Sequence, residues 1–295
     1  MILIIGCNGF IGINLTKYFL EINPNEKIIG VGRNKSKIKG YKNFQYIEMD
    51  ILKSNIFNIL QNVKIQTIIF LAADAEVNKI SMDERKIQIN NNINLTKKLI
   101  HILKEIKPRK VIYFSTVYVY SENKKKLSEN SKTSPSTSLG KSKIKSEKLL
   151  KDFSFKNTDI SFLILRLFTV YGKNMRKSQF LYEAIKKLKS KKKEVIFYNP
   201  NTFRNFIHVK DVSQITYNLY IKKFKGFKII NIASKNSTKI KVIINLIKKY
   251  TKIKKIITYK SNQNNNSHFA NTNKLFGFVK NIKLVKLEKG IKELI

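Results

Sequence analysis

The chain has 295 residues, of which 42% are hydrophobic and 11% aromatic, a composition typical of one large or two modest folded domains. Its formal charge is +40, from 59 Lys and Arg against 19 Asp and Glu, yet the lysines are spread along the whole chain without the interleaved aromatic residues that a stacking surface for nucleic acid needs. We therefore expect no nucleic-acid partner and interpret the charge as a solvated basic exterior that favours phosphorylated ligands.

Cysteine content and hydropathy indicate in which cellular compartment the protein is expected. The single cysteine, Cys7, excludes an intrachain disulfide. The sequence has neither a charged-then-apolar leader nor an apolar run long enough to cross a bilayer. Three His and one Cys also offer no ligand spacing for a metal ion. We expect a cytoplasmic protein with no membrane span and no metal site.

The first predicted element is a strand over residues 2–5 that turns directly into a helix ending near residue 22. Gly6, Gly9 and Gly12 lie at the turn, at a spacing of three. Gly6 would form the tight turn, Gly9 would let the backbone approach a pyrophosphate, and Gly12 would let the helix pack close to the sheet. The helix N-terminus would then hold the negative charge. This order of strand, glycines and amphipathic helix predicts a dinucleotide site.

Strands and helices alternate along the rest of the first half of the chain. We expect strands over 27–31, 44–49, 67–71, 110–115 and 160–168, and helices over 87–106 and from 142 past 150. This βαβ series predicts an α/β fold with a Rossmann-type, doubly wound parallel sheet. The predicted dinucleotide-binding domain covers residues 1–171 and is completed by a strand near 226–233.

The pattern loosens after residue 171, where a smaller, interleaved substrate-binding region is expected over 172–295. Its predicted elements are helices over 180–189 and 239–249, strands over 195–197 and 228–232, an Asn-rich loop over 263–267 and a helical tail from residue 273. A segment over 202–211 lies between them without an assigned element. No internal repeat or long linker interrupts the chain.

Ordered motifs extend over essentially the full chain. They are Gly6-x-x-Gly9-x-x-Gly12, Asp50-Ile51, Leu71-Ala72-Ala73, Asn92-Ile93-x-x-Thr96, Ser115-Thr116, Leu165-Arg166, Val170-Tyr171-Gly172 and the stretch 203–212. In this order they resemble the extended short-chain dehydrogenase/reductase family, whose members epimerise, dehydrate or reduce nucleotide sugars. The resemblance implies a nucleotide-sugar substrate and an NAD or NADP cofactor.

The resemblance also implies which residues contact the cofactor. In the glycine loop they are Gly6, Asn8, Gly9, Phe10, Ile11 and Gly12. Asp50 and Ile51 would flank the adenine, and Leu71, Ala72 and Ala73 would line the dinucleotide. Asn92 would support the wall of the active site through backbone contacts.

Arg33 bears on the choice between NAD and NADP. Gly32-Arg33 ends the second predicted strand, where NAD-dependent enzymes usually have an acid for the ribose hydroxyls. A guanidinium at this position can pair with a 2′-phosphate instead. We therefore favour NADP, and the alternative is that Arg33 is a solvated surface residue.

Thr169 and Arg204 are the substrate-binding residues that the resemblance implies. Arg204 resembles the arginine that holds the nucleotide diphosphate, and a guanidinium pairs with phosphate in a bidentate manner. Asn205 follows it where the family usually has aspartate. His208, in the same stretch, is expected to be structural.

The family's chemistry uses a Tyr-x-x-x-Lys pair on one helix and a Ser or Thr from the fifth strand. The matching stretch is Leu139-Gly140-Lys141-Ser142-Lys143, which aligns without a gap and has leucine at the tyrosine position. Thr116 and Lys143 are retained, but leucine cannot carry a proton. Tyr118 follows Thr116 by two residues, and strand alternation predicts that both side chains point to the same face.

Two functions from different classes remain open. In an NAD(P)-dependent nucleotide-sugar epimerase or reductase, Thr116 would orient the substrate oxygen, Lys143 would fix the nicotinamide ribose, and Tyr118 or water would relay the proton. In a weakly active or inactive relative, the chain would only bind dinucleotide and nucleotide sugar, and Leu139 is the evidence for this. The dehydratases of the family have Asp-Glu where this chain has Val117-Tyr118, so sugar 4,6-dehydration is not expected. Pairing through the helices near 87–106 and 142–150, frequent in the family, implies a homodimer as one option.

Overall fold

The computed structural model describes residues 1–60, 63–77, 79, 81–121, 126–261 and 267–295. Its seven-stranded central sheet has the strand order β12-β7-β5-β4-β1-β2-β3. The strands are β1 (Ile2–Ile5), β2 (Ile28–Gly32), β3 (Phe44–Glu48), β4 (Thr67–Phe70), β5 (Lys110–Thr116), β7 (Ser161–Leu167) and β12 (Phe227–Ile232). The pairs from β5 across to β3 are parallel, and the sheet confirms the predicted Rossmann-type fold.

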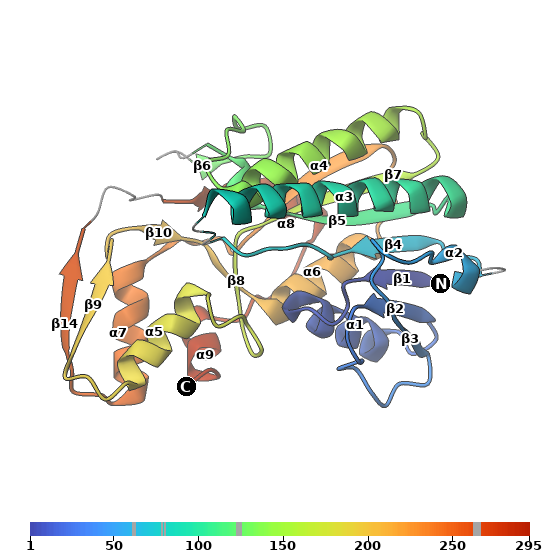
Figure 1. Cartoon of the computed structure of the whole chain (residues 1–295). Coiled ribbons are helices and arrows are strands. Elements are labelled where there is room, and N and C mark those ends of the chain that lie inside the picture. Colours follow the sequence, from blue (N-terminus) through green and yellow to red (C-terminus); the bar gives the residue numbers. More distant parts are fainter. Residues whose placement is uncertain (61–62, 78, 80, 122–125, 262–266) are drawn as a thin grey trace. The chain divides into compact units, whose positions relative to one another are not determined.

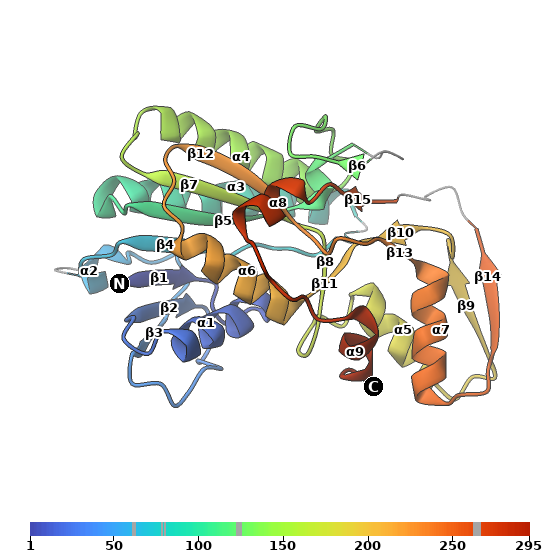
Figure 2. The same cartoon turned by 180° about the vertical axis from the view of Figure 1, so that it is seen from behind.

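Helices cover both faces of this sheet (Figures 1 and 2). On one face α3 (Met82–Ile106) and α4 (Ser138–Phe155) lie side by side, and on the other lie α1 (Phe10–Ile22) and α6 (Val209–Ile221). With helices on both faces, a parallel sheet is buried on both sides. The central strand β1 is accordingly a continuous apolar run, and all four of its residues are buried.

The starts of α3 and α4 follow from local sequence. The hydroxyl of Ser81 accepts a hydrogen bond from Glu84 N, and the Glu84 carboxylate accepts one from Ser81 N, which is a capping box. Thr137 Oγ1 accepts from Gly140 N at the start of α4. α4 therefore begins at Ser138, four residues before the predicted start.

The strand order places a switch point between β1 and β4. From β1 the chain builds outward through β2 and β3 on one side, and through β4 and β5 on the other. The loops after β1 and β4 therefore diverge at the carboxyl edge of the sheet, where open α/β sheets bind their ligands. The glycine loop follows β1, and Leu71-Ala72-Ala73 follows β4.

The chain divides into two compact units. The first comprises Met1–Ser121, Lys132–Arg166 and Ser213–Ile230, and the second Glu122–Ser131, Leu167–Val212 and Asn231–Ile295. The first unit also contains α2 (Phe57–Leu60) and the 3-10 turn η1 (Val117–Val119). The assignment of cofactor binding to residues 1–171 and of substrate binding to 172–295 stays a prediction.

The second unit is built from short strands paired two by two, with helices between them. It contains β6 (Lys126–Leu127), β8 (Thr169–Tyr171), α5 (Phe180–Lys189), β9 (Glu194–Tyr198), β10 (Phe203–Arg204), β11 (Phe206–His208), β13 (Thr238–Lys239), α7 (Ile240–Thr251), β14 (Ile256–Lys260), β15 (Phe269–Ala270), α8 (Asn273–Phe278) and α9 (Leu287–Lys292). The strand pairs are β6 with β15, β8 with β11, β9 with β14, and β10 with β13.

The two longest elements that were not predicted are α6 and β14, and the short elements α2, η1, β6, β8, β10, β11, β13 and β15 were not predicted either. Most of the predicted Asn-rich loop, residues 263–266, lies outside the described residues. Among the described residues, none of the helices combines the length and the apolar character that a membrane crossing requires.

Candidate active site

The glycine loop after β1 packs closely against neighbouring backbone at Gly6 and Gly12 and is open at Gly9. Gly6 has φ +91, and a Cβ on it would lie 2.7 Å from Ala72 N in the loop after β4. A Cβ on Gly12 would collide with the Gly6 carbonyl oxygen. Gly9 differs, because it is exposed and a Cβ there would approach no atom closer than 3.4 Å. The space in front of Gly9 is therefore free to receive a ligand.

The residues around this loop fit a bound dinucleotide. Gly9 is the N-cap of α1, and the first turn of that helix carries no acidic side chain. Phe10 and Ile11 are half-buried at its start. Free backbone N–H groups and the positive end of the helix dipole favour phosphate at such a position. The lack of a Cβ at Gly9 lets that phosphate come close.

Asn8 ties the glycine loop to the loop after β2. Its Nδ2 donates to the carbonyl oxygens of Asn34 (2.8 Å) and Lys35 (3.0 Å), and its Oδ1 accepts from Lys37 N at 3.1 Å. Nδ2 is also 2.7 Å from the Tyr46 hydroxyl. The side-chain amide of Asn8 thus shapes the loop that carries Arg33, and Arg33 itself is exposed.

The residues predicted to flank the adenine follow β3, and those predicted to line the dinucleotide follow β4. Asp50 Oδ1 accepts from Leu52 N at 3.0 Å, which folds the turn after β3, and the neighbouring Ile51 is buried. After β4, the residues predicted to line the dinucleotide, Leu71 to Ala73, are half-buried.

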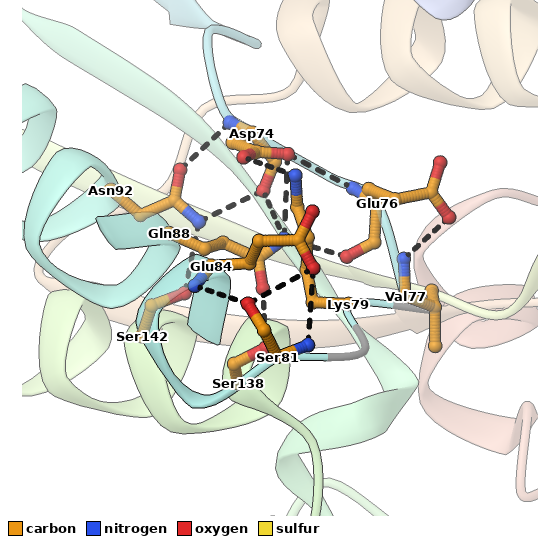
Figure 3. A network of polar contacts seen from close by, with 10 residues as sticks. All are labelled: Asp74, Glu76, Val77, Lys79, Ser81, Glu84, Gln88, Asn92, Ser138 and Ser142. Carbon is orange, nitrogen blue, oxygen red and sulfur yellow. Dashed lines mark hydrogen bonds and ion pairs between the residues drawn. The ribbon is translucent and has the colours of Figure 1, made fainter. Parts of the chain in front are cut away.

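A polar network holds the loop after β4 against α3 and α4 (Figure 3). Asn92 Oδ1 accepts from Asp74 N at 2.8 Å, and Asn92 Nδ2 donates to Asp74 O at 2.9 Å. Gln88 Nε2 donates to the carbonyl oxygens of Asp74 (3.2 Å) and Glu76 (2.6 Å). Asp74 also lies 3.4 Å from the Lys79 ammonium. Asn92 and Gln88 therefore fix the backbone that continues from Ala73.

The same face of α3 pairs with serines of α4. The pairs are Gln88 with Ser138, Asn92 with Ser142 at 3.0 Å, and Thr96 with Ser146 at 2.8 Å. All six side chains are buried, and each row advances four residues at a time. These three pairs form a polar seam between the two helices. Because every buried polar atom of this seam needs a partner, the pairs set one register between α3 and α4. Gln88 and these serines were not among the predicted site residues. The signal for them is that the two members of each pair are 50 residues apart in the sequence.

The residue after each of these serines belongs to a second row of α4, directed at β5. Lys143 Nζ donates to Phe114 O at 2.7 Å and to the Tyr113 hydroxyl at 3.1 Å. Glu147 accepts from Ser115 and forms a 2.6 Å ion pair with Arg166. Leu139 is the third member of the row and is only 4% exposed. The position predicted to correspond to the tyrosine of the family is thus buried, one helical turn before Lys143.

Thr116 and Tyr118 do not share a strand. β5 ends at Thr116, and the next three residues form the turn η1. Thr116 caps the start of this turn, because its Oγ1 accepts a hydrogen bond from Tyr118 N at 3.3 Å. The prediction that Tyr118 continues the strand of Thr116 is therefore wrong, and strand alternation does not apply to this pair. Val117 and Val119 are residue types typical of strands, but here they belong to the turn and are buried. The role of Tyr118 stays a prediction.

Thr169 and Arg204 lie in the second unit, on β8 and β10. Thr169 pairs with Phe206 of β11, and Arg204 pairs with Thr238 of β13. Arg204 Nη1 donates to Phe203 O at 2.9 Å. Burial and the nearby Arg204 guanidinium lower the pKa of His268 to about 3. His268 is therefore neutral at physiological pH, and Arg204 supplies the positive charge here.

Asn205 and His208 have structural contacts in this unit. Asn205 Nδ2 donates to Ser234 O at 2.9 Å, and its Oδ1 accepts from Ala270 N at 3.0 Å. An aspartate could not donate the first of these bonds, so the local contacts explain why asparagine fits at position 205. His208 is buried, and its Nδ1 accepts from Lys210 N at 3.2 Å.

This chain is similar to known epimerases over most of its length. The model of the NAD dependent epimerase/dehydratase family matches residues 2–233. An uncharacterized UDP-glucose epimerase of Bacillus subtilis is 29% identical over 221 residues, which are 71% of this chain and 69% of that protein. A UDP-glucuronate 4-epimerase of Thermodesulfobacterium geofontis is 24% identical over 261 residues, 84% and 79% of the two chains.

Solved structures are similar over nearly the whole chain. The UDP-glucuronic acid 4-epimerase of Bacillus cereus, in complex with UDP-glucuronic acid and NAD, has a TM-score of 0.88 and 26% identity. The alignment covers 99% of this chain and 96% of that one.

Proposed function

The chain belongs to the NAD-dependent epimerase/dehydratase family, and we propose that it is an NAD(P)-dependent epimerase or reductase of a nucleotide sugar. The observation that carries the proposal is the open position in front of Gly9, at the N-terminus of α1 and beside the loop after β4. Thr116 and Lys143 supply the retained polar groups at the carboxyl end of β5.

The chemistry assigned to this chain's residues is limited to orientation and proton transfer. The nicotinamide, when bound, accepts and returns a hydride. Thr116 orients the oxygen of the sugar, and Lys143 holds the nicotinamide ribose. Because Leu139 cannot exchange a proton, Tyr118 or a water molecule carries the proton to and from that oxygen.

We propose a uridine diphosphate sugar as the substrate class. The relatives above act on UDP-glucose or UDP-glucuronate by name, and the B. cereus structure holds UDP-glucuronic acid. The basic surface of this chain favours such an anionic ligand.

Arg204 provides the test of the nucleotide-sugar assignment. We expect Arg204→Ala to weaken UDP binding by ~1.5–3 kcal/mol, the contribution of a charge-assisted hydrogen bond, with unchanged dinucleotide affinity. Arg109→Ala, which removes the same charge from a loop before β5, is the control and should leave both affinities unchanged. Calorimetric titration with UDP, ADP and GDP measures the effect. If no nucleoside diphosphate binds the wild-type protein, the assignment is wrong.

Arg33 tests the choice of dinucleotide. We expect the wild-type protein to bind NADP more tightly than NAD, and Arg33→Asp to reverse this preference, because a carboxylate repels the 2′-phosphate and accepts from the ribose hydroxyls instead. Lys39→Asp makes the same charge change in the same exposed loop and should leave NADP preferred. Fluorescence titration with NADPH and NADH measures the ratio. Equal wild-type affinities would remove the role of Arg33.

The second candidate function is binding without efficient turnover, and Leu139 favours it. Loss of a general acid–base residue costs about 10²–10⁴ in rate. The same fold would then bind a dinucleotide and a nucleotide sugar as a sensor or as a subunit beside an active partner.

A further inference from the structure

Lys143 is a buried ammonium group held by neutral oxygen atoms. It is 4% exposed, and none of the ion pairs among the described residues includes it. An ammonium group has three N–H donors. Two of them have acceptors, Phe114 O and the Tyr113 hydroxyl. Within the described part of the chain, the third donor of Lys143 has no hydrogen-bond acceptor, so it is available to a ligand hydroxyl.

The Tyr113 side chain is itself held in one place. It is 1% exposed, and its ring stacks on Phe70 of β4 with the centroids 5.8 Å apart and the planes inclined by 10°. Its hydroxyl lies 3.4 Å from Thr96 Oγ1 of α3. Lys143 Nζ is 4.4 Å from the centroid of the same ring, within the range of a cation–π contact. Tyr113 thus contacts the ammonium with both its hydroxyl and its ring face.

We propose that Tyr113 is a positioning residue that holds Lys143 so that its third N–H remains for the ribose of the nicotinamide half of the cofactor. The inference rests on the proposed function, in which Lys143 binds that ribose. Leu139, one helical turn before Lys143, has no hydroxyl to share the ammonium with. The hydroxyl of Tyr113, from the strand, contacts the lysine in its place.

The experiment compares NAD with ADP, which lacks the nicotinamide ribose, by calorimetric titration of NAD and by competition of ADP against NAD. We expect Tyr113→Phe to raise the Kd for NAD about three- to tenfold, the effect of one hydrogen bond, and to leave the Kd for ADP unchanged. Thr96→Val removes the contact that orients the Tyr113 hydroxyl, together with the hydrogen bonds from Thr96 to Ser146 and to Asn92 O, and should change NAD binding in the same direction by less. Lys143→Met should have the largest effect on NAD.

Tyr171→Phe is the matched control. Tyr171 is equally buried at 1% exposure, lies in the second unit, and its hydroxyl has no hydrogen-bond partner within the described residues. This variant should leave both affinities unchanged. If Lys143→Met weakens NAD binding and Tyr113→Phe does not, the inference is wrong and the ribose role of Lys143 stands. If neither variant affects NAD, both the inference and that part of the proposed function are wrong. Equal weakening of NAD and ADP by Tyr113→Phe would mean a general structural role and would also overturn it.

Discussion

Gly9→Val is expected to abolish binding of NAD and NADP while the protein remains folded. Gly9 has φ −73 and ψ 170, a conformation that valine adopts without strain. Its Cβ would meet only the Gly6 carbonyl oxygen, at 3.4 Å. The branched side chain would instead occupy the space in front of the N-terminus of α1, where we propose that the pyrophosphate binds. We expect at least ~100-fold weaker binding, equivalent to about 2.7 kcal/mol.

Fluorescence titration with NADPH and NADH, together with thermal unfolding, measures both parts of this expectation. Gly277→Val is the control, because a Cβ on Gly277 in α8 approaches no other atom within 4 Å, so it makes the same chemical change away from the loop. Gly12→Ala should behave differently, since its methyl group collides with the Gly6 carbonyl oxygen and destabilises the fold. Wild-type affinity in Gly9→Val would overturn the assignment of the cofactor site.

The fold could be predicted because the central strands of its sheet are buried on both faces. Such strands are apolar runs, as in Ile2–Ile5 and in Thr67–Phe70 after its first residue, and short runs bounded by turns are easily recognised. α6 was missed because polar residues divide its apolar ones. Val212, Ile215 and Leu219 are all buried at helical spacing, and that spacing was the signal that could have revealed the helix.

The glycine loop could be predicted and the polar seam could not, for different physical reasons. Gly6 and Gly12 are required by close backbone approaches, which a single residue type records in the sequence. The seam between α3 and α4 depends on pairs of common residues from two helices, such as Asn92 with Ser142. No local pattern distinguishes these serines from solvent-exposed ones. The hydroxyl of Tyr113 was likewise hidden, because tyrosine inside a buried strand is read as core.

The position of Leu139 on α4 makes it the residue whose replacement distinguishes the two candidate functions. Its row of the helix continues with Lys143 and Glu147, whose side chains reach Phe114 O and Ser115 of β5. A tyrosine at position 139 would therefore stand one turn from the ammonium and beside the end of β5. Under the proposed function, the hydroxyl of a tyrosine at this position is the group that separates the two candidate functions.

If Tyr118 has taken over proton transfer, Tyr118→Phe should abolish the hydride transfer of the wild-type protein, and Leu139→Tyr should raise it little. If the site is merely disabled, Tyr118→Phe should be nearly silent and Leu139→Tyr should create or raise activity at least tenfold, within the range of about 10²–10⁴ for a positioned proton donor.

Nicotinamide absorbance and sugar products are followed across a panel of UDP-sugars and their 4-keto forms. Leu139→Phe is the matched control, because it adds the same ring to a buried position without the hydroxyl and separates proton transfer from overpacking, which costs about 1–3 kcal/mol of stability. We expect turnover in the wild-type protein that depends on Tyr118; no wild-type turnover on any of these substrates, together with a gain in Leu139→Tyr but not in Leu139→Phe, would establish the binding-only function.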